Sequence, residues 1–227
     1  MVKKSPSGPR REESLSRERI IDASIALLDE AGESGLTFRA LSQKLATGPG
    51  AIYWHVANKS ELVTAACDTI VSRAMNAQLA DATPEATIRA IALGMFDAID
   101  AHPWVGSALA HAPGQLPAVR ILERIGQQIR MLGVPRDDEW TTVSALLSYI
   151  LGVGGQNAAN AQFAQTEGLN RPAFLESVAN TWSELDPAEY PFARSVATQL
   201  SGHDDRADFL TGIDLILKGI GKSYAQQ

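Results

Sequence analysis

Apolar residues recur at three- and four-residue spacing along most of this chain, with polar residues between them. Between Ser16 and Gly32 this spacing predicts a first helix, and the glycine is a typical residue just past a helix end. Alternation of apolar and polar residues, which would indicate a strand, nowhere persists for long. The pattern therefore predicts an all-α protein without internal repeats.

The next segment predicts two short helices joined by a tight turn. Thr37 is a plausible N-cap for a helix over 38–46, residues 47–49 break it, and a second short helix covers 50–56. Asn58 and Glu61 have the spacing of a capping box, which opens a longer helix that reaches Met75. Short helices around a tight turn are typical of a helix-turn-helix.

The rest of the chain also reads as helical. Residues 140–166 contain no charge and could span a bilayer by length, but their eight Ser, Thr, Asn and Gln side chains before Phe163 oppose this. We expect instead a long helix buried on most sides. Its Gly152, Gly154 and Gly155 permit either tight packing or the approach of a ligand. The predicted helices are 84–99, 104–111, 116–132, 137–165, 172–182, 193–199 and one from after Asp205 to Tyr224.

Charge divides the chain unevenly. The 227 residues have a net charge of -6, yet residues 1–62 have a net charge of +1 and residues 63–227 a net charge of -7. Residues 1–19 hold six basic and three acidic side chains, so residues 1–16 form either a DNA-contacting flexible arm or a solvated terminus. The single Cys67 excludes a disulfide framework and a cysteine-based zinc site, and no signal peptide is evident, so we expect a cytoplasmic location.

Candidate DNA-binding chemistry lies in residues 50–56. Ile52 and Val56 are four residues apart and can pack inward, which leaves Ala51, Tyr53 and His55 facing outward. Tyr and His side chains can donate hydrogen bonds to phosphate, and small apolar groups can contact the thymine methyl group. The alternative is an aromatic-rich helix that only packs on the first helix.

The segment 17–62 resembles the DNA-binding domain of the tetracycline repressor (TetR) family of bacterial transcription regulators. The resemblance lies in Gly35-Leu36-Thr37, Leu41, Leu45, Ala51 to Val56, and Asn58 to Leu62. It implies a three-helix DNA-binding domain at 17–62, followed by a larger helical domain at 63–227 that binds an effector and dimerises. It also implies a repressor that binds a palindromic double-stranded DNA operator as a homodimer and is released by a hydrophobic or aromatic small molecule.

The same resemblance assigns roles within the DNA-binding domain. Arg39 approaches base edges, and Thr37 binds phosphate. The base-reading positions hold Pro49, Gly50 and Ala51, whose side chains form no hydrogen bonds, so specificity is expected from Arg39, apolar contacts and DNA shape. The remaining contacts implied are phosphate for Tyr53 and His55, sugar and thymine methyl for Trp54, and the DNA backbone for Lys59.

Residues 209–219 also resemble the final helix of the family, which implies a four-helix interface in which the long helix at 140–165 takes part. Gln156 stands where the tetracycline repressors place a Glu ligand, so magnesium-tetracycline is not expected, and neither a metal nor a cofactor is predicted. Aromatic and polar side chains that suit an effector pocket are His102, Trp104, His111, Trp140, Tyr149, Gln156, Asn157 and Asn160.

No phosphate-binding loop, nucleophile elbow or metal-spaced histidine cluster appears, so no enzyme is predicted. Cys67 is interpreted as a small buried hydrophobe. Two alternatives stay open: an all-α small-molecule-binding protein without DNA function, and a small-molecule enzyme in the helical domain.

Overall fold

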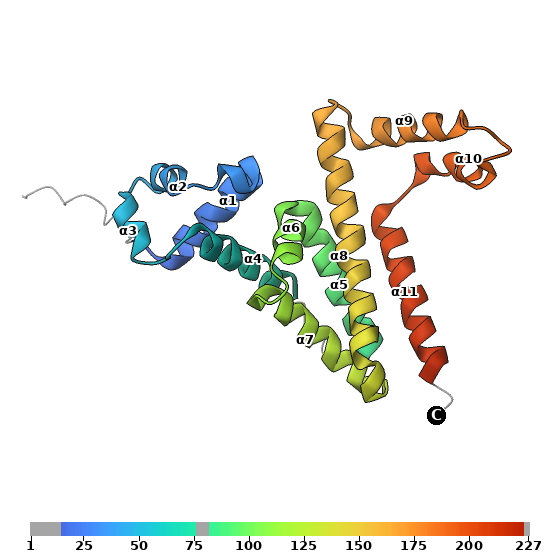
Figure 1. Cartoon of the computed structure of the whole chain (residues 1–227), viewed down its shortest axis with the longest axis horizontal. Helices are drawn as coiled ribbons and strands as arrows, with labels where there is room; N and C mark the ends of the chain where they lie inside the picture. The colour runs from blue at the N-terminus through green and yellow to red at the C-terminus, as the bar shows by residue number, and fades with distance from the viewer. Residues whose placement is uncertain (1–14, 76–81, 225–227) are drawn as a thin grey trace, which may run out of the picture. The chain divides into compact units, whose positions relative to one another are not determined.

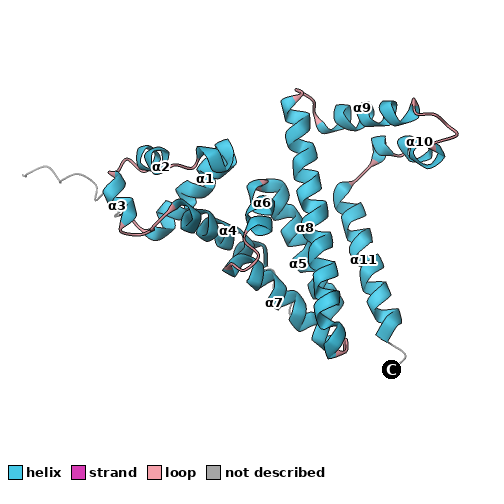
Figure 2. Cartoon of the chain, viewed as in Figure 1, coloured by secondary structure: helices cyan, strands magenta, loops and turns pink. Residues whose placement is uncertain are grey.

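The computed structural model describes residues 15–75 and 82–224 of the chain, and over these residues every regular element is helical (Figures 1 and 2). The all-α prediction is confirmed. The predicted basic arm lies almost wholly in residues 1–14, outside the described residues. The helices are α1 (Arg17–Gly35), α2 (Phe38–Lys44), α3 (Pro49–Tyr53), α4 (Lys59–Met75), α5 (Pro84–Ala101), α6 (Trp104–His111), α7 (Leu116–Met131), α8 (Arg136–Thr166), α9 (Arg171–Ser183), α10 (Pro191–Ala197), the 3-10 turn η1 (Leu200–Gly202) and α11 (Asp205–Tyr224).

The chain divides into two compact units, with the boundary between Ala66 and Cys67 inside α4. The N-terminal unit holds α1, α2, α3 and the first turns of α4. Its core is aliphatic, and a hydroxyl buried in it is satisfied locally, because Ser24 donates to the Ile20 carbonyl at 2.7 Å. The core side chains are Ile20, Ile21, Ile25, Leu28, Leu36, Leu41, Ile52, Val56, Leu62 and Ala66.

In the C-terminal unit, α5 packs against α7, α8 and α11, while α6 packs against α8 and α9 pairs with α10 (Figure 1). The helices α5, α7, α8 and α11 each bury one apolar stripe, as their sequence spacing predicts. On α7 the stripe is Ile121, Ile125 and Ile129, all fully buried. The second half of α4 joins this unit, and Arg120 of α7 pairs with Asp68 through two hydrogen bonds of 3.0 and 3.1 Å.

The glycines of α8 allow tight packing on one side of the helix. A Cβ atom on Gly154 would lie 3.1 Å from the Ile99 Cδ1 atom, and one on Gly106 would lie 3.8 Å from the Gly155 Cα atom. A Cβ atom added to Gly152 or Gly155 would meet nothing within 4 Å, so at these two positions the approach of a ligand stays a prediction. Close packing therefore accounts for Gly154 alone among the three glycines.

The prediction that α8 is buried on most sides is wrong for the single chain. One face buries Val143, Leu146, Ile150, Gly154 and Ala158, whereas the opposite face is open to solvent. Sequence alone indicates that the helix lacks charge, and it does not say which molecule covers the second face. The exposed stripe, called here the α8 stripe, consists of Thr141, Ala145, Ser148, Gly152, Gln156 and Ala159.

An aromatic stack joins α5, α8 and α11. The ring of Phe209 lies between Phe96, at 4.7 Å between centroids, and Tyr149, at 5.6 Å. The Tyr149 hydroxyl also donates to the Phe209 carbonyl at 3.3 Å. Gly212 makes room for this tyrosine, because a Cβ atom there would lie 1.8 Å from its Oη atom. The final helix thus packs on the long helix within one chain.

Candidate nucleic-acid interface

The turn between α2 and α3 follows from its local sequence. Ala46 takes a left-handed conformation, with φ 50°, and the Thr47 amide donates to the Ser42 carbonyl at 3.0 Å. Pro49 then occupies the first turn of α3, where its missing amide hydrogen costs no helical hydrogen bond. Leu41 and Ile52 are fully buried, so the two short helices are fixed at both ends of the turn. This is the predicted helix-turn-helix.

The apolar side chains of α3 point inward and its aromatic side chains are exposed. Ile52 and Val56 are buried, as predicted from their spacing. Tyr53 is 55% exposed and Trp54 is 90% exposed. Ala51 and His55, which the pattern placed outward, are half-buried. An indole this exposed contributes almost nothing to the free energy of folding, so its position favours contact with another molecule.

The ring of Tyr53 is held in place by a neighbouring aromatic ring. Its ring stacks on Phe38 of α2 with 4.3 Å between centroids and 13° between planes. Because the hydroxyl lies at the far end of a fixed ring, it can donate a hydrogen bond without first being ordered. Phe38 is a residue that sequence reasoning missed, and its place at the start of the second helix was the only available signal.

Two polar residues at the start of α2 face solvent. The Thr37 hydroxyl oxygen accepts the Ala40 amide at 3.1 Å as an N-cap, which leaves the hydroxyl hydrogen available to a phosphate oxygen. Arg39 is exposed and makes no ion pair within the described chain. Its five donors suit either a base edge or a phosphate group. The exposed Pro49 and Gly50 begin α3 and offer no side-chain donor, as their identities require.

The start of α4 is fixed by the capping box that the sequence predicts. The Asn58 side-chain oxygen accepts the Glu61 amide at 2.9 Å, and the Glu61 carboxylate accepts the Ala57 amide at 2.8 Å. That backbone bond, followed by the hydrogen bond from Arg17 at 3.2 Å, lowers the pKa of Glu61. Lys59 donates to the Glu33 carbonyl at the end of α1, at 2.5 Å, and its ammonium group retains two donors.

The family model for bacterial regulatory proteins of the tetR family matches residues 20–66. A solved structure of the transcriptional regulator SCO7222, a TetR from Streptomyces coelicolor, is 51% identical with a TM-score of 0.82, over 91% of this chain and 98% of that one.

This chain belongs to the TetR family. The repressor DrrR1 of Streptomyces coeruleorubidus is 26% identical, over 94% of this chain and 80% of that protein. The structure of BioQ with its double-stranded DNA operator is 25% identical with a TM-score of 0.57, over 84% of this chain and all of that one. The protein is therefore a helix-turn-helix transcription regulator, and the relatives matched are named as regulators.

Within this TetR-family regulator, the residues predicted to bind an effector have different surroundings. His102 ends α5 with its ring edge-on to Trp104 at 6.2 Å, and Trp104 is nearly buried. His111 ends α6, and its Nδ1 atom lies 2.7 Å from the Ser107 carbonyl oxygen. Trp140 lies on the first turns of α8 and is 68% exposed.

The other four candidates lie along α8. Tyr149 belongs to the aromatic stack with Phe209, and the Asn157 amide donates to Asp100 of α5 at 3.0 Å. Gln156 is exposed on the α8 stripe, and Asn160 is half-buried. These contacts do not gather the eight candidates into one cavity, so their role in effector binding stays a prediction.

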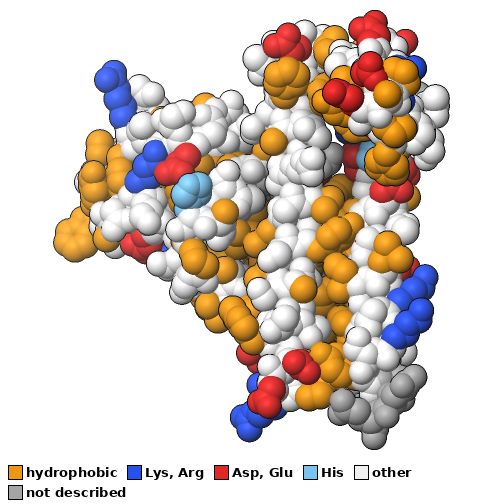
Figure 3. Space-filling view, turned by 45° about the vertical axis from the view of Figure 1, so that its right-hand side comes forward, with side chains coloured by type: hydrophobic (Ala, Val, Ile, Leu, Met, Phe, Trp, Pro, Cys, Tyr) orange, Lys and Arg blue, Asp and Glu red, His pale blue; other side chains and the backbone are white. Residues whose placement is uncertain are grey.

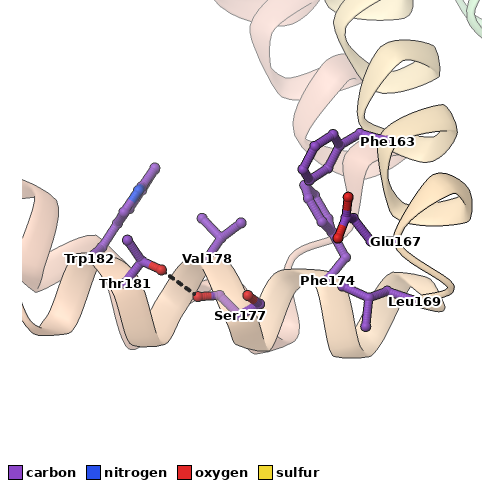
Figure 4. A pocket seen from close by; sticks show the side chains of 8 residues that line it. All are labelled: Phe163, Glu167, Leu169, Phe174, Ser177, Val178, Thr181 and Trp182. Atoms are coloured by element: carbon purple, nitrogen blue, oxygen red, sulfur yellow. Dashed lines mark hydrogen bonds between the residues drawn. The ribbon is translucent and has the colours of Figure 1, made fainter.

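A cavity of about 330 Å³ instead lies between the end of α8 and α9 (Figure 4). The sequence analysis did not predict this cavity. The available signal was the presence of three aromatic residues, Phe163, Phe174 and Trp182, near the charge-free C-terminal end of α8. Its lining is Phe163, Glu167, Leu169, Phe174, Ser177, Val178, Thr181 and Trp182.

None of the helices over residues 15–75 and 82–224 has the length and apolarity needed to cross a membrane.

Proposed function

We propose that this protein binds a palindromic operator as a homodimer in the cytoplasm and represses transcription until a small-molecule effector releases it. The observation that carries the proposal is the 90% exposure of Trp54 at the end of α3. The indole stands beside the stacked Tyr53 on a helix whose other face is fully packed. A rigid helix with exposed aromatic side chains suits the major groove better than water.

The contacts fall into two chemical groups. Thr37, Tyr53, His55 and Lys59 carry hydrogen-bond donors and are assigned to phosphate oxygens, which fix the register of the helix on the duplex. Arg39 is assigned to base edges, with Trp54 against sugar and thymine methyl groups. Pro49, Gly50 and Ala51 let α3 approach the bases closely. Sequence preference then comes from few hydrogen bonds and from the shape of the DNA.

The α8 stripe is the proposed dimer interface. Its six exposed residues are uncharged, and most of them are small, so a second helix can approach closely. Figure 3 shows the long helix without charged side chains along most of its length. Leu215 of α11 adds an apolar side chain that is 65% exposed. A self-complementary surface of this kind fits a two-fold dimer, which in turn fits a palindrome.

Effector release is a linkage between two binding equilibria. If the effector binds more tightly to a form whose two reading helices do not match the operator, it weakens operator binding by the same factor. The names of two relatives support the direction of this proposal: DrrR1 is a repressor, and BioQ was solved on its operator.

The test begins with selection of double-stranded DNA from a random pool by the wild-type protein. We expect a palindrome whose half-sites lie about 34–36 Å apart, or a multiple of that spacing. Binding of the selected DNA is then compared for Trp54→Ala, Arg39→Ala and the control Phe192→Ala, which removes an aromatic ring that is also exposed. Loss of a base or sugar contact predicts roughly 10-fold weaker binding for the first two variants and no change for the control.

Thermal unfolding of all three variants should match the wild type, because each side chain removed is exposed. A selected pool without any palindrome would contradict the dimeric operator. Unchanged affinity of Trp54→Ala and Arg39→Ala would instead favour an all-α small-molecule-binding protein that lacks a DNA function.

A further inference from the structure

The cavity between α8 and α9, called here the groove, is formed by the turn that joins the two helices. Gly168 takes φ 69°, and the Leu169 amide donates to the Ala164 carbonyl at 2.8 Å, which is the Schellman arrangement at a helix end. The turn brings α9 back so that the ring of Phe174 meets Phe163 edge-on, with 6.1 Å between centroids. The groove is therefore fixed by backbone geometry and by a ring contact.

Three aromatic rings and one carboxylate define its chemistry. Phe163 and Phe174 lie beside Glu167 at one end, and Trp182 lies at the other end, past Val178 (Figure 4). Glu167 is the only charged side chain among the lining residues, and no Lys, Arg or His is among them. A cation near aromatic faces is attracted by their quadrupole, and a carboxylate adds a direct ion pair.

We propose that this groove binds an organic cation, specifically a protonated amine attached to an aromatic body. The ammonium group is placed against Glu167 and the two phenylalanine rings, and the aromatic body extends over Val178 toward Trp182. A volume of about 330 Å³ suits a small molecule of this kind. The inference rests on the proposed function, because it names the chemical class of the effector and a site for it.

A second copy of the chain would be a poorer occupant of the groove. The α8 stripe carries no charge, so a partner that presents this stripe offers nothing to neutralise Glu167. Covering an unpaired carboxylate with such a surface costs free energy. A protonated amine satisfies the carboxylate and the aromatic rings together.

The test uses isothermal titration calorimetry of the full-length protein with naphthylethylamine, which is protonated near neutral pH, and with naphthylethanol, its neutral analogue. The variants are Glu167→Gln and the control Glu176→Gln, which changes an exposed carboxylate of α9 outside the groove. We expect the amine to bind the wild type and the control equally. We expect Glu167→Gln to weaken amine binding by about 10-fold and to leave the alcohol unaffected.

Equal affinity for the amine and the alcohol would overturn the proposal, since the groove would then be apolar without charge selection. So would unchanged amine binding in Glu167→Gln, or no binding accompanied by dimer dissociation in Phe174→Ala, which would make the groove an interface between copies. Operator retardation without ligand tests the proposed function separately, so a protein that retards DNA and ignores the amine refutes only the groove.

Discussion

Replacing Gly212 by alanine should destabilise the C-terminal unit, although alanine is the better helix former. The new Cβ atom would lie 1.8 Å from the Tyr149 Oη atom and 2.4 Å from its Cζ atom, so the tyrosine ring has to move. Movement breaks the 3.3 Å hydrogen bond to the Phe209 carbonyl and the stacking on the Phe209 ring. Phe209 itself is buried against Phe96, so it cannot follow the tyrosine outward.

The magnitude follows from these contacts. The lost hydrogen bond costs about 1 kcal/mol, and the lost ring pair costs about 0.5–1.5 kcal/mol. Residual overpacking adds about 1 kcal/mol where the ring cannot clear the methyl group, while helix propensity returns up to about 1 kcal/mol. The net expectation is a loss of roughly 1–3 kcal/mol in the free energy of unfolding, or about 2–12 °C in Tm.

The assay is urea unfolding followed by circular dichroism, with Gly221→Ala as the matched control. Gly221 lies in the same helix, and a Cβ atom there would meet nothing within 4 Å, so this variant should be neutral or slightly stabilised. Gly212→Ala is also made in a Tyr149→Ala background, where the clash is gone and the substitution should cost nothing. The same cost in both backgrounds would refute the steric reasoning.

Two further predictions concern titratable groups. Burial, and secondarily Asp68, raises the pKa of the Cys67 thiol to about 12, so iodoacetamide at about pH 8 should leave native protein unlabelled and label it in urea; native labelling at the rate of a free thiol contradicts this. Because the pKa of Glu61 is lowered in the folded protein, the Glu61 carboxylate stabilises the fold at pH values above its ordinary pKa of 4.5. This contribution is lost as the pH falls through the lowered pKa. The stability difference between wild type and Glu61→Gln in urea should therefore be present at about pH 6 and shrink below about pH 4.5, whereas a constant difference would argue against the charge.

Local signals predicted most of the helix ends. The capping box of Asn58 and Glu61 lies where the spacing placed it, and Thr83 caps α5 through the Ala86 amide at 3.3 Å. Gly32 has φ 62° and interrupts α1, as expected, but a further turn follows to Gly35. A cap or a breaker acts within four residues, so a single sequence carries it completely.

Contacts between distant residues were the part that the sequence did not determine. Tyr53 was identified as exposed and aromatic, yet its support by Phe38 depends on how two short helices cross. Tyr149 was predicted to line a pocket because it combines an aromatic ring with a polar group. Its stacking on Phe209 becomes apparent only when α11 is placed beside α8. The same side-chain types serve a core or a pocket, and packing decides between them.

The charge-free run of α8 shows how such ambiguity can still be informative. Absence of charge predicted burial, and the chain alone buries only one face of the helix. Keeping six uncharged residues on the open face has no advantage for a monomer, since charged side chains there would improve solubility. The run ends at Glu167, where the surface changes from a small uncharged stripe to an aromatic groove with one carboxylate. One helix therefore carries two neighbouring surfaces of different chemistry, the first suited to a second copy of the chain and the second to a cation.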